Sequence, residues 1–457
     1  MSSFDDTIAA IATAPGEGGV AIVRVSGPDA LRIADEVFRS AAPKPSERAT
    51  HTIVHGHVDD ADGNELDDVV LLIMRAPQSY TAEDVIEIQG HGGNVAAKRI
   101  LRRVLDAGAR AAEPGEFTKR AFINGRIDLV QAEAVLDLVH AGSERAAAAA
   151  VEQLEGKLSR SFNELYDFLV SIAADVEATL DFPDDELPAT ALPELLQRLN
   201  TADERIGQLL STWDEGHILR EGALVVISGK PNVGKSTMLN ALLGRDRAIV
   251  SQVPGTTRDT IEEKYVLEGI PLRLVDTAGL RETECEVEQE GVRRARAHIQ
   301  KSDLHLYLID ASKALDDDDR DHLAAMKSEK CVVVLNKVDL GQVVRSEQLK
   351  DATVVRTSLL TGGGVDEVRR AVIGKLTSGI SLSAVPHASI SERHRRLLVE
   401  ARGGIREALS LIRDEAGNVV LAADRIRDSL ENLGMITGKV YHDELLASIF
   451  SRFCVGK

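Results

Sequence analysis

The segment from Gly229 to Ser236, GKPNVGKS, has the residue types and spacing of a phosphate-binding loop. It follows the apolar run 223–227 directly and precedes a helical pattern over 237–243. In such a unit the glycines let backbone N–H groups point inward around a phosphate, and the helix adds its positive end. Lys235 is expected to contact the β and γ phosphates, and the Ser236 hydroxyl to take one coordination position on Mg²⁺. The loop residues expected to bind the nucleotide are Asn232, Val233, Gly234, Lys235, Ser236 and Thr237.

A second motif, Asn336-Lys337-Val338-Asp339, follows the apolar run 331–335 and predicts that the base is guanine. The Asp339 carboxylate can accept hydrogen bonds from the ring N–H and the exocyclic amine of guanine, whereas adenine offers no such donor pair. ATP would leave buried polar groups unpaired, so the site is expected to select GTP. The residues expected at the base are Asn336, Lys337, Asp339 and Ser358, the last followed by Leu359 where GTPases usually carry alanine.

Two further segments predict the magnesium-binding and switch regions. Asp276, at the end of the alternating strand pattern 272–275, is expected to hold Mg²⁺ through water, and Gly279 to sense the γ phosphate. The Thr257 hydroxyl is expected to close over the metal when a γ phosphate is present. The nucleotide-binding residues in these segments are Ser251, Gln252, Val253, Pro254, Gly255, Thr256, Thr257, Asp276, Thr277, Ala278 and Gly279.

One position departs from the Ras-like pattern. Leu280 stands where Ras-like proteins carry the glutamine that orients the attacking water, and an apolar side chain cannot do this. The acidic stretch 281–288 offers several carboxylates that could help instead. On the residues alone, a solvated acidic loop is the favoured explanation for any single one of them.

Length and composition indicate a globular chain of about three domains, since it has 457 residues of which 44% are hydrophobic. The first residues are acidic and do not resemble a targeting segment, and no apolar run approaches the roughly 18 residues of a membrane span. We therefore expect a cytoplasmic protein with no membrane partner. The three cysteines lie far apart and predict neither a disulfide framework nor a zinc site.

The formal charge of −19 argues against nucleic-acid binding through overall electrostatics. Local basic patches could still bind RNA, although a solvated helix face is the favoured interpretation of each. The candidates are Lys98, Arg99, Arg102 and Arg103, then Arg293, Arg294 and Arg296, and then Arg393, Arg395 and Arg396.

Changes of pattern along the chain predict a multidomain fold. Residues 1–118 mix short strands with a helix near 95–107 and indicate an α+β domain, whereas 119–219 and 379–457 are helical. The prolines at 183, 188 and 193 are expected to separate helices, and Asp316 to Asp319 to form an acidic turn. The segment 220–378 is expected to be an α/β P-loop GTPase domain of Ras-like type. Its insertion into one all-α helical domain is favoured, and two separate helical domains are the alternative.

At full length, the chain resembles the MnmE (TrmE) family of tRNA modification GTPases. The resemblance is carried by the GTPase motifs, by three N-terminal segments and by the tail Phe453-Cys454-Val455-Gly456-Lys457. The N-terminal segments are Gly18–Gly27, Tyr80–Gly93 and Pro114–Phe122.

The resemblance implies a GTP hydrolase that works in a complex on certain tRNAs. With a flavoprotein of the MnmG (GidA) family, in a heterotetramer, it would install a carboxymethylaminomethyl or aminomethyl group at C5 of the wobble uridine (position 34). The one-carbon unit would come from 5-formyl- or methylene-tetrahydrofolate. The N-terminal domain would bind this folate and form a homodimer, and K⁺-dependent dimerisation of the G domains would drive hydrolysis.

The resemblance also assigns residues. Arg24, Glu87, Arg126 and Lys457 match folate-contacting positions, and a pterin shows Glu87 the same donor pair that guanine shows Asp339. Asn232, Ser251, Val253 and Thr256 match the K⁺ site, where the cation offsets charge that develops on the leaving oxygens. Glu288 matches the glutamate that activates water. Beside it we count Lys235 and Cys454 as catalytic residues.

Two questions stay open on the sequence. The Cys454 thiol could take part in the one-carbon chemistry, or the residue could simply pack the tail. The function could also be that of a ribosome-assembly or signalling GTPase of the Era type, or of a regulatory dimer whose partner performs all nucleoside chemistry.

Overall fold

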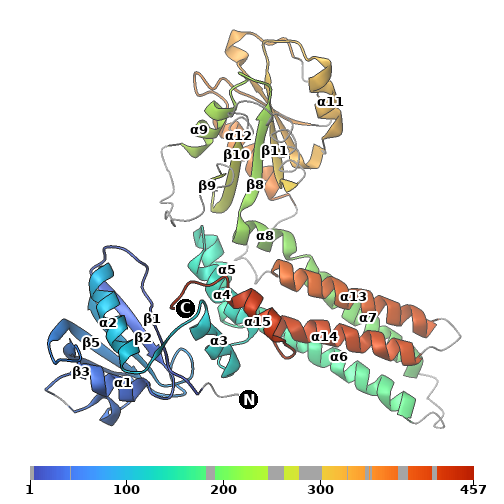
Figure 1. Cartoon of the computed structure of the whole chain (residues 1–457). Helices are drawn as coiled ribbons and strands as arrows, with labels where there is room; N and C mark the ends of the chain where they lie inside the picture. Colours follow the sequence, from blue (N-terminus) through green and yellow to red (C-terminus); the bar gives the residue numbers. More distant parts are fainter. Residues whose placement is uncertain are drawn as a thin grey trace, which may run out of the picture. The chain divides into compact units, whose positions relative to one another are not determined.

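The computed structural model describes residues 5–41, 43–181, 191–244, 262–276, 301–326, 328–344, 349, 352–378, 390–413 and 419–457. They belong to two compact units (Figure 1). The first unit comprises Met1–Leu136, Gln153–Ala202 and Glu400–Lys457, and the second comprises Asp137–Glu152 and Asp203–Val399.

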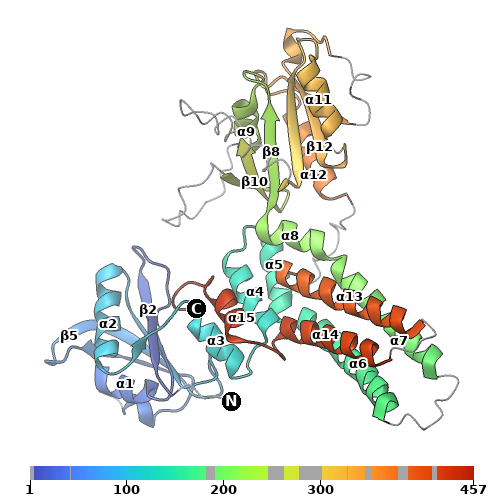
Figure 2. The ribbon, with the colours of Figure 1, turned by 45° about the vertical axis from the view of Figure 1, so that its right-hand side comes forward.

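The N-terminal part of the first unit is a seven-stranded sheet of order β3-β4-β5-β6-β2-β1-β7. Two amphipathic helices pack their apolar sides on one face of this sheet, where Ile33, Ile100 and Val104 meet Val25 and Ile88 (Figure 2). The strands are β1 (Ile8–Ile11), β2 (Val20–Ser26), β3 (Phe38–Arg39), β4 (Thr52–Asp59), β5 (Glu65–Met74), β6 (Val85–His91) and β7 (Arg110–Ala111), and the helices are α1 (Ala30–Val37) and α2 (Asn94–Asp106), with a 3₁₀ turn at Pro45–Glu47.

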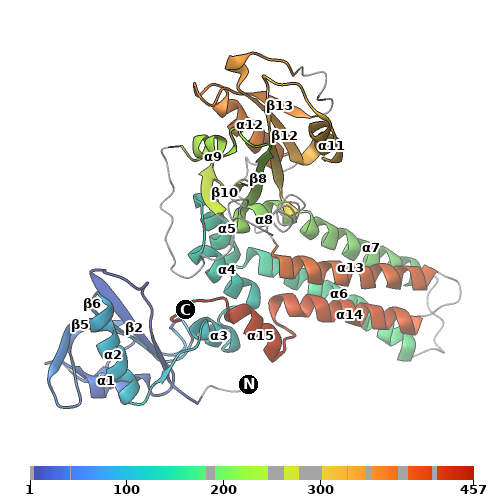
Figure 3. The ribbon, with the colours of Figure 1, turned by 45° about the horizontal axis from the view of Figure 1, so that its top comes forward.

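Helices from both sides of the GTPase segment pack together in the first unit. Helix α6 (Lys157–Asp181) lies beside α14 (Val419–Thr437) (Figure 3). Ion pairs of Arg427 with Glu177 and of Lys439 with Asp167, at 2.6 and 3.1 Å, join the two segments. This pairing fits an inserted G domain and not two separate helical domains. The other helices outside the two sheets are α3 (Glu116–Ile123), α4 (Leu129–Val139), α5 (Glu144–Leu154), α7 (Ala191–Leu210), α8 (Trp213–Glu221), α13 (Glu392–Arg413) and α15 (Asp443–Phe450).

The C-terminal tail is docked in the first unit. Phe453 is buried in a cluster with Phe450, Phe122 and Leu129, and Val455 forms an isolated antiparallel bridge with Pro114. Gly456 has φ +98°, and a Cβ there would clash with the backbone of Ile11 and Ala12, so only glycine fits.

The second unit contains a six-stranded sheet of order β13-β12-β11-β8-β10-β9. All neighbours are parallel except the β9–β10 pair. Helices α9 and α12 cover one face, and α11 covers the other (Figure 1). The strands are β8 (Ala223–Gly229), β9 (Glu262–Leu267), β10 (Ile270–Asp276), β11 (Leu304–Asp310), β12 (Cys331–Asn336) and β13 (Thr353–Arg356), and the helices are α9 (Lys235–Leu243), α11 (Asp317–Ala325) and α12 (Val365–Leu376), with 3₁₀ turns at Ser328–Lys330 and Val338–Leu340.

Two local predictions were wrong. Pro193 lies in the first turn of α7, where its missing N–H costs no helical hydrogen bond, and does not lie between helices. The segment Asp316–Asp319 is not a turn, because Asp316 is the N-cap of α11 and forms a reciprocal capping box with Asp319. None of the described helices combines the length and the apolar character that crossing a membrane requires.

Candidate functional site

The phosphate loop lies between β8 and α9, and its backbone explains the spacing of its glycines. Gly229 has φ +143°, and a Cβ on it would clash with the carbonyl oxygen of Leu308. Gly234 has φ +103°, and a Cβ on it would lie 2.6 Å from Asn336 Nδ2. Asn232 also has a positive φ, +63°. The loop therefore curls as a phosphate nest requires, and no side chain larger than hydrogen fits at either glycine.

Lys235 and the magnesium-ligand candidates are in place beside this loop. Lys235 Nζ donates to the carbonyl oxygens of Gly229 and Lys230, at 3.0 and 2.8 Å, so the ammonium group lies across the loop. Ser236 Oγ donates to Asp276 Oδ2 at 2.8 Å. A hydroxyl beside a carboxylate is a donor set that Mg²⁺ accepts together with waters and phosphate oxygens. The residues present therefore fit the ion.

Asn336 joins the base-reading loop to the phosphate loop. Its side chain is 3% exposed, and Nδ2 donates to the Val233 carbonyl at 2.8 Å. Its Oδ1 accepts from Thr357 Oγ1 and from the Leu359 backbone N–H, both at 3.2 Å. Leu359 thus contributes its backbone, which explains why leucine can replace the usual alanine.

The remaining guanine candidates, Lys337, Asp339 and Ser358, differ in their exposure and contacts. Lys337 has φ +65°, and its Nζ donates to Asp310 Oδ2 at 2.9 Å. Burial raises the pKa of Asp310, but hydrogen bonds from Ser312 and Lys337 outweigh it and lower this pKa overall. Among the described residues, the exposed Asp339 carboxylate has no hydrogen-bond partner, and neither does the buried Ser358 Oγ. The exposed Asp339 carboxylate is therefore available to a base.

Several predicted site residues lie outside the described residues. Of the proposed K⁺ ligands only Asn232 is described, and it is exposed. Thr237 is described and exposed at the start of α9. The residues outside the described part are Ser251, Gln252, Val253, Pro254, Gly255, Thr256, Thr257, Thr277, Ala278, Gly279 and Glu288.

A second polar site lies on the N-terminal sheet of the first unit. Arg24 on β2 and Glu87 on β6 are register partners, and Arg24 Nε donates to Glu87 Oε1 at 2.8 Å. Their side chains are 17% and 13% exposed. The Tyr80 ring has the Arg24 guanidinium 5.2 Å and the Arg126 guanidinium 5.1 Å from its centroid, both within cation–π range. Arg126 Nη1 also donates to the Tyr80 carbonyl at 2.7 Å, so two predicted residues, Arg24 and Arg126, meet at one aromatic ring that the prediction had not included.

The C-terminal tail reaches the same site. Arg24 Nη1 donates to the Gly456 carbonyl at 3.5 Å, and the Gly115 N–H donates to the Cys454 carbonyl at 3.4 Å. The Lys457 N–H donates to the Cys454 carbonyl, also at 3.4 Å. The Cys454 side chain is exposed, and Phe453 supplies the buried contact of the tail. Phe453, and not Cys454, therefore packs the tail against the first unit.

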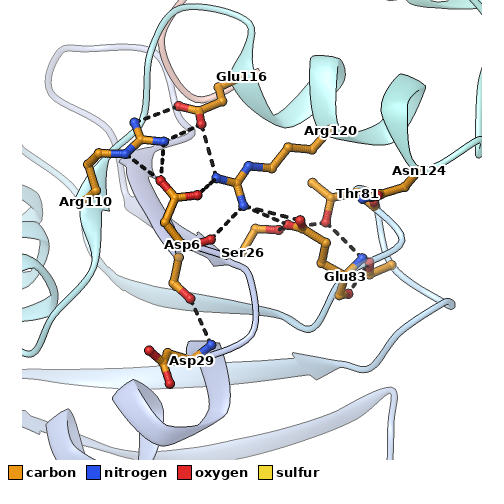
Figure 4. Close-up of polar contacts among 11 residues, drawn as sticks. Asp6, Ser26, Asp29, Thr81, Glu83, Arg110, Glu116, Arg120 and Asn124 are labelled. Atoms are coloured by element: carbon orange, nitrogen blue, oxygen red, sulfur yellow. Dashed lines mark hydrogen bonds and ion pairs between the residues drawn. The ribbon is translucent and has the colours of Figure 1, made fainter. Parts of the chain in front are cut away.

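Beneath this site lies a buried ionic network centred on Arg120 (Figure 4). The Arg120 side chain is fully buried and donates to Asp6 Oδ1 at 2.6 Å, to Glu116 Oε1 at 3.2 Å and to Glu83 at 3.3 Å. Ser26 Oγ donates to Glu83 Oε2 at 2.7 Å. Burial raises the pKa of Asp6 and Glu116, but hydrogen bonds from the arginines, Arg110 first, lower both values overall.

The same network fixes the segment that carries Tyr80. Asn124 Nδ2 donates to the Thr81 carbonyl at 2.8 Å, and Tyr80 Oη lies 2.9 Å from Thr118 Oγ1. Helix α3 and the residue that follows it thus position the Tyr80–Glu83 segment. Apart from the pair of Arg120 with Glu116, one helical turn earlier, the partners of Tyr80 and Arg120 lie far away along the chain, so the sequence offered little local signal for either residue.

His305 on β11 contacts Ser228, which precedes the phosphate loop on β8, and predicts a pH dependence of stability. Its Nε2 lies 2.6 Å from Ser228 Oγ, and burial, with a smaller effect from His322, lowers the pKa of His305 to about 4. The unfolded chain, with the ordinary histidine pKa near 6.5, then binds the proton more readily. The contribution of neutral His305 is therefore complete above pH 6.5 and is lost as pH falls toward 4.

We expect the second unit to lose about 2 kcal/mol between pH 7 and pH 5 through this group alone. Urea unfolding followed by the fluorescence of Trp213, the chain's single tryptophan, measures it. His305→Gln can still hydrogen-bond to Ser228 but does not titrate, so its pH slope should be shallower by that amount. Equal slopes for the two proteins would contradict the prediction.

Comparison with known proteins covers the whole chain. The family model of the MnmE helical domain matches residues 129–454, and that of the GTP-binding protein TrmE N-terminus matches residues 7–126. A Geobacter metallireducens protein named tRNA modification GTPase MnmE is 47% identical over 459 residues, which cover 99% of this chain and 100% of that protein. The protein of the same name from Geobacter sulfurreducens is 46% identical over 464 residues, 99% of each chain.

Among solved structures, Aquifex aeolicus Era bound to GDP and aluminium fluoride is 26% identical. The match covers 42% of this chain and 68% of that chain, at a TM-score of 0.26. The sequence relatives are different, because their identity extends through the N-terminal sheet, the helices and the tail as well as the nucleotide site. The chain belongs to the MnmE (TrmE) family of tRNA modification GTPases.

Proposed function

We propose that this protein is the GTP-hydrolysing component of a complex that installs a carboxymethylaminomethyl or aminomethyl group at C5 of the wobble uridine of certain tRNAs. The observation that carries the proposal is the likeness over 99% of the chain to relatives named tRNA modification GTPases. A general GTPase would need only the second unit, whereas here the N-terminal sheet and the docked tail are shared as well. The functional domains would be 1–118, 119–219, 220–378 and 379–457.

The site around Arg24, Glu87, Arg126 and Lys457 would bind a tetrahydrofolate carrying a formyl or methylene group. Glu87 uses Oε1 for Arg24, and Oε2 has no hydrogen bond within the described residues, so it can accept from a ring with adjacent N–H donors. The Tyr80 ring and the two guanidinium groups offer flat surfaces beside it. When bound, the folate supplies the one-carbon unit. The exposed Cys454 thiol lies on the same tail as a candidate participant.

The proposed partners rest on the family and on the lack of one sequence motif. The sequence has no fingerprint of a flavin- or dinucleotide-binding loop, so a redox step would belong to a flavoprotein partner of the MnmG (GidA) family. The protein would act in the cytoplasm as a homodimer within a heterotetramer, with tRNA as substrate.

In the nucleotide site, Lys235 would orient the phosphates and Asp339 would select the base. Ser236, Asp276 and Thr257 would hold Mg²⁺, and Asn232, Ser251, Val253 and Thr256 would hold K⁺. The two ions offset negative charge on the phosphate oxygens as the bond breaks. Because Leu280 cannot orient water, Glu288 is the proposed catalytic carboxylate.

Replacing Glu288 by alanine is therefore expected to abolish K⁺-stimulated GTP turnover, a loss of at least about 10²-fold, while GTP affinity stays near normal. Phosphate release with and without K⁺, together with GTP titration, measures the two quantities. Glu286→Ala removes a carboxylate from the same acidic stretch and should retain stimulation. A full K⁺-stimulated rate in Glu288→Ala would refute the assignment.

The function itself is tested by mass spectrometry of nucleosides from total tRNA of cells with and without the gene. Loss of the C5-aminomethyl family of wobble uridines is the expected result. Unchanged uridines with altered ribosomal subunit profiles would instead indicate an assembly GTPase of the Era type.

A further inference from the structure

Lys230, the second residue of the phosphate loop, points its ammonium group at helix α11. Nζ donates to Asp319 Oδ2 at 2.8 Å and also to Asp316 Oδ2. Asp316 and Asp319 are the two members of the capping box at the start of α11. The loop that would hold the phosphates is thus tied to a helix that begins more than 80 residues later.

Asp319 is built into this contact. It is 6% exposed, and its other oxygen, Oδ1, accepts from Tyr307 Oη at 3.0 Å. Tyr307 lies on β11 and is itself 4% exposed. Both carboxylate oxygens therefore have buried or half-buried partners, and removal of Lys230 would leave a buried negative charge without its cation.

The backbone of Lys230 contacts Lys235. The Lys230 carbonyl accepts from Lys235 Nζ at 2.8 Å, so one residue connects α11, through its side chain, to the phosphate-binding lysine, through its backbone. Burial tends to lower the pKa of Lys230, but the hydrogen bonds to Asp316 and Asp319 outweigh it and raise this pKa overall. The tether is therefore charged at neutral pH.

We propose that Lys230 is a positioning residue for nucleotide binding, a tether that holds the phosphate loop and Lys235 in register through Asp316 and Asp319. The obvious alternative is a second phosphate ligand, because a lysine in this loop is close to where the phosphates bind. As a phosphate ligand, Lys230 Nζ would have to leave both carboxylates, and Asp319 would lose its cation. As a tether, Lys230 keeps these charges paired. This inference goes beyond the proposed function but rests on the GTP binding that it includes.

The two roles predict opposite signs for one substitution. If Lys230 is a tether, Asp319→Asn releases the loop and weakens GDP and GTP binding by about tenfold. If Lys230 is a phosphate ligand, the same change frees its ammonium group for the phosphates and tightens binding. Lys230→Met should match Asp319→Asn, and the double variant should lose about tenfold and not a hundredfold, because both changes break one contact.

The experiment uses the full-length protein, with Kd values for fluorescent GDP and GTP and steady-state hydrolysis. The tether predicts a raised KM with kcat within about twofold at saturating GTP, and recovery of most of the affinity in Lys230→Arg. Asp317→Asn is the matched control, because Asp317 carries the same charge on the same helical turn, is 94% exposed and pairs with the exposed Arg320. Its Kd should not change.

Tighter binding by Asp319→Asn, additive losses in the double variant, or an equal loss in Asp317→Asn would each overturn the tether. If Asp319→Asn proves to be unfolded by circular dichroism, the Lys230→Met and Lys230→Arg pair decides alone, and equal affinity of both with wild type refutes the proposal. A wild-type protein that binds neither nucleotide would refute GTP binding, and thereby the proposed function, before any variant is compared.

Discussion

Replacing Asp339 by asparagine is expected to lower the affinity for GTP by roughly 10⁴-fold and to transfer the preference to xanthosine triphosphate. The Asp339 carboxylate is exposed and has no hydrogen-bond partner among the described residues. It can accept from both guanine donors, whereas an asparagine amide places its own N–H₂ against one of them. Xanthine carries an oxygen where guanine carries the amine, so the amide and that oxygen are complementary.

The rest of the site should survive this change. Asn336, which joins the two loops, is held by hydrogen bonds with Val233, Thr357 and Leu359, none of which involves Asp339. Competition between GTP and xanthosine triphosphate for the full-length protein, in wild type and Asp339→Asn, measures the switch. Asp366→Asn, a change of the same kind on the exposed start of α12, serves as the control. Near-normal GTP affinity in Asp339→Asn would show that another group reads the base.

The phosphate loop could be predicted because its geometry is local. Gly229 and Gly234 have to be glycine for reasons that act within a few residues, a positive φ and the close approach of β11 and Asn336. The strands before the motifs were also predictable, since buried parallel strands are continuous apolar runs, as in 223–227 and 331–335. The order of the motifs along the chain then predicted a P-loop GTPase domain.

What the sequence could not predict are contacts between distant segments. Tyr80 meets Arg24 and Arg126 only because β2, a loop and the end of α3 converge. Lys230 likewise contacts Asp319 only because the fold brings together two segments that are far apart in the sequence. The four aspartates at 316–319 were read as a turn from composition alone, although aspartate is also among the best residues for an N-cap and a first helical turn.

Replacing Arg120 by methionine is expected to destabilise the first unit by about 3–5 kcal/mol. The substitution keeps most of the side-chain volume but removes the cation that pairs with Asp6, Glu83 and Glu116 at 2.6 to 3.3 Å. Glu83 and Glu116 are 13% and 6% exposed, so they would be left as buried carboxylates with fewer partners. Denaturant unfolding followed by circular dichroism gives the loss, and Trp213 fluorescence should change little because that residue lies in the second unit.

The control for Arg120→Met is Arg32→Met, which removes an arginine that is 53% exposed and pairs with Asp29 and Glu36. It should cost less than about 1 kcal/mol, since exposed ion pairs contribute little. If both variants cost the same, the buried network is no more important than a surface pair. If only Arg120→Met is costly, the buried network stabilises the first unit. Arg120 also holds the segment that contains Thr81 and Glu83, next to Tyr80. Tyr80 should therefore move in Arg120→Met, and folate binding at the proposed site should weaken before the fold is lost.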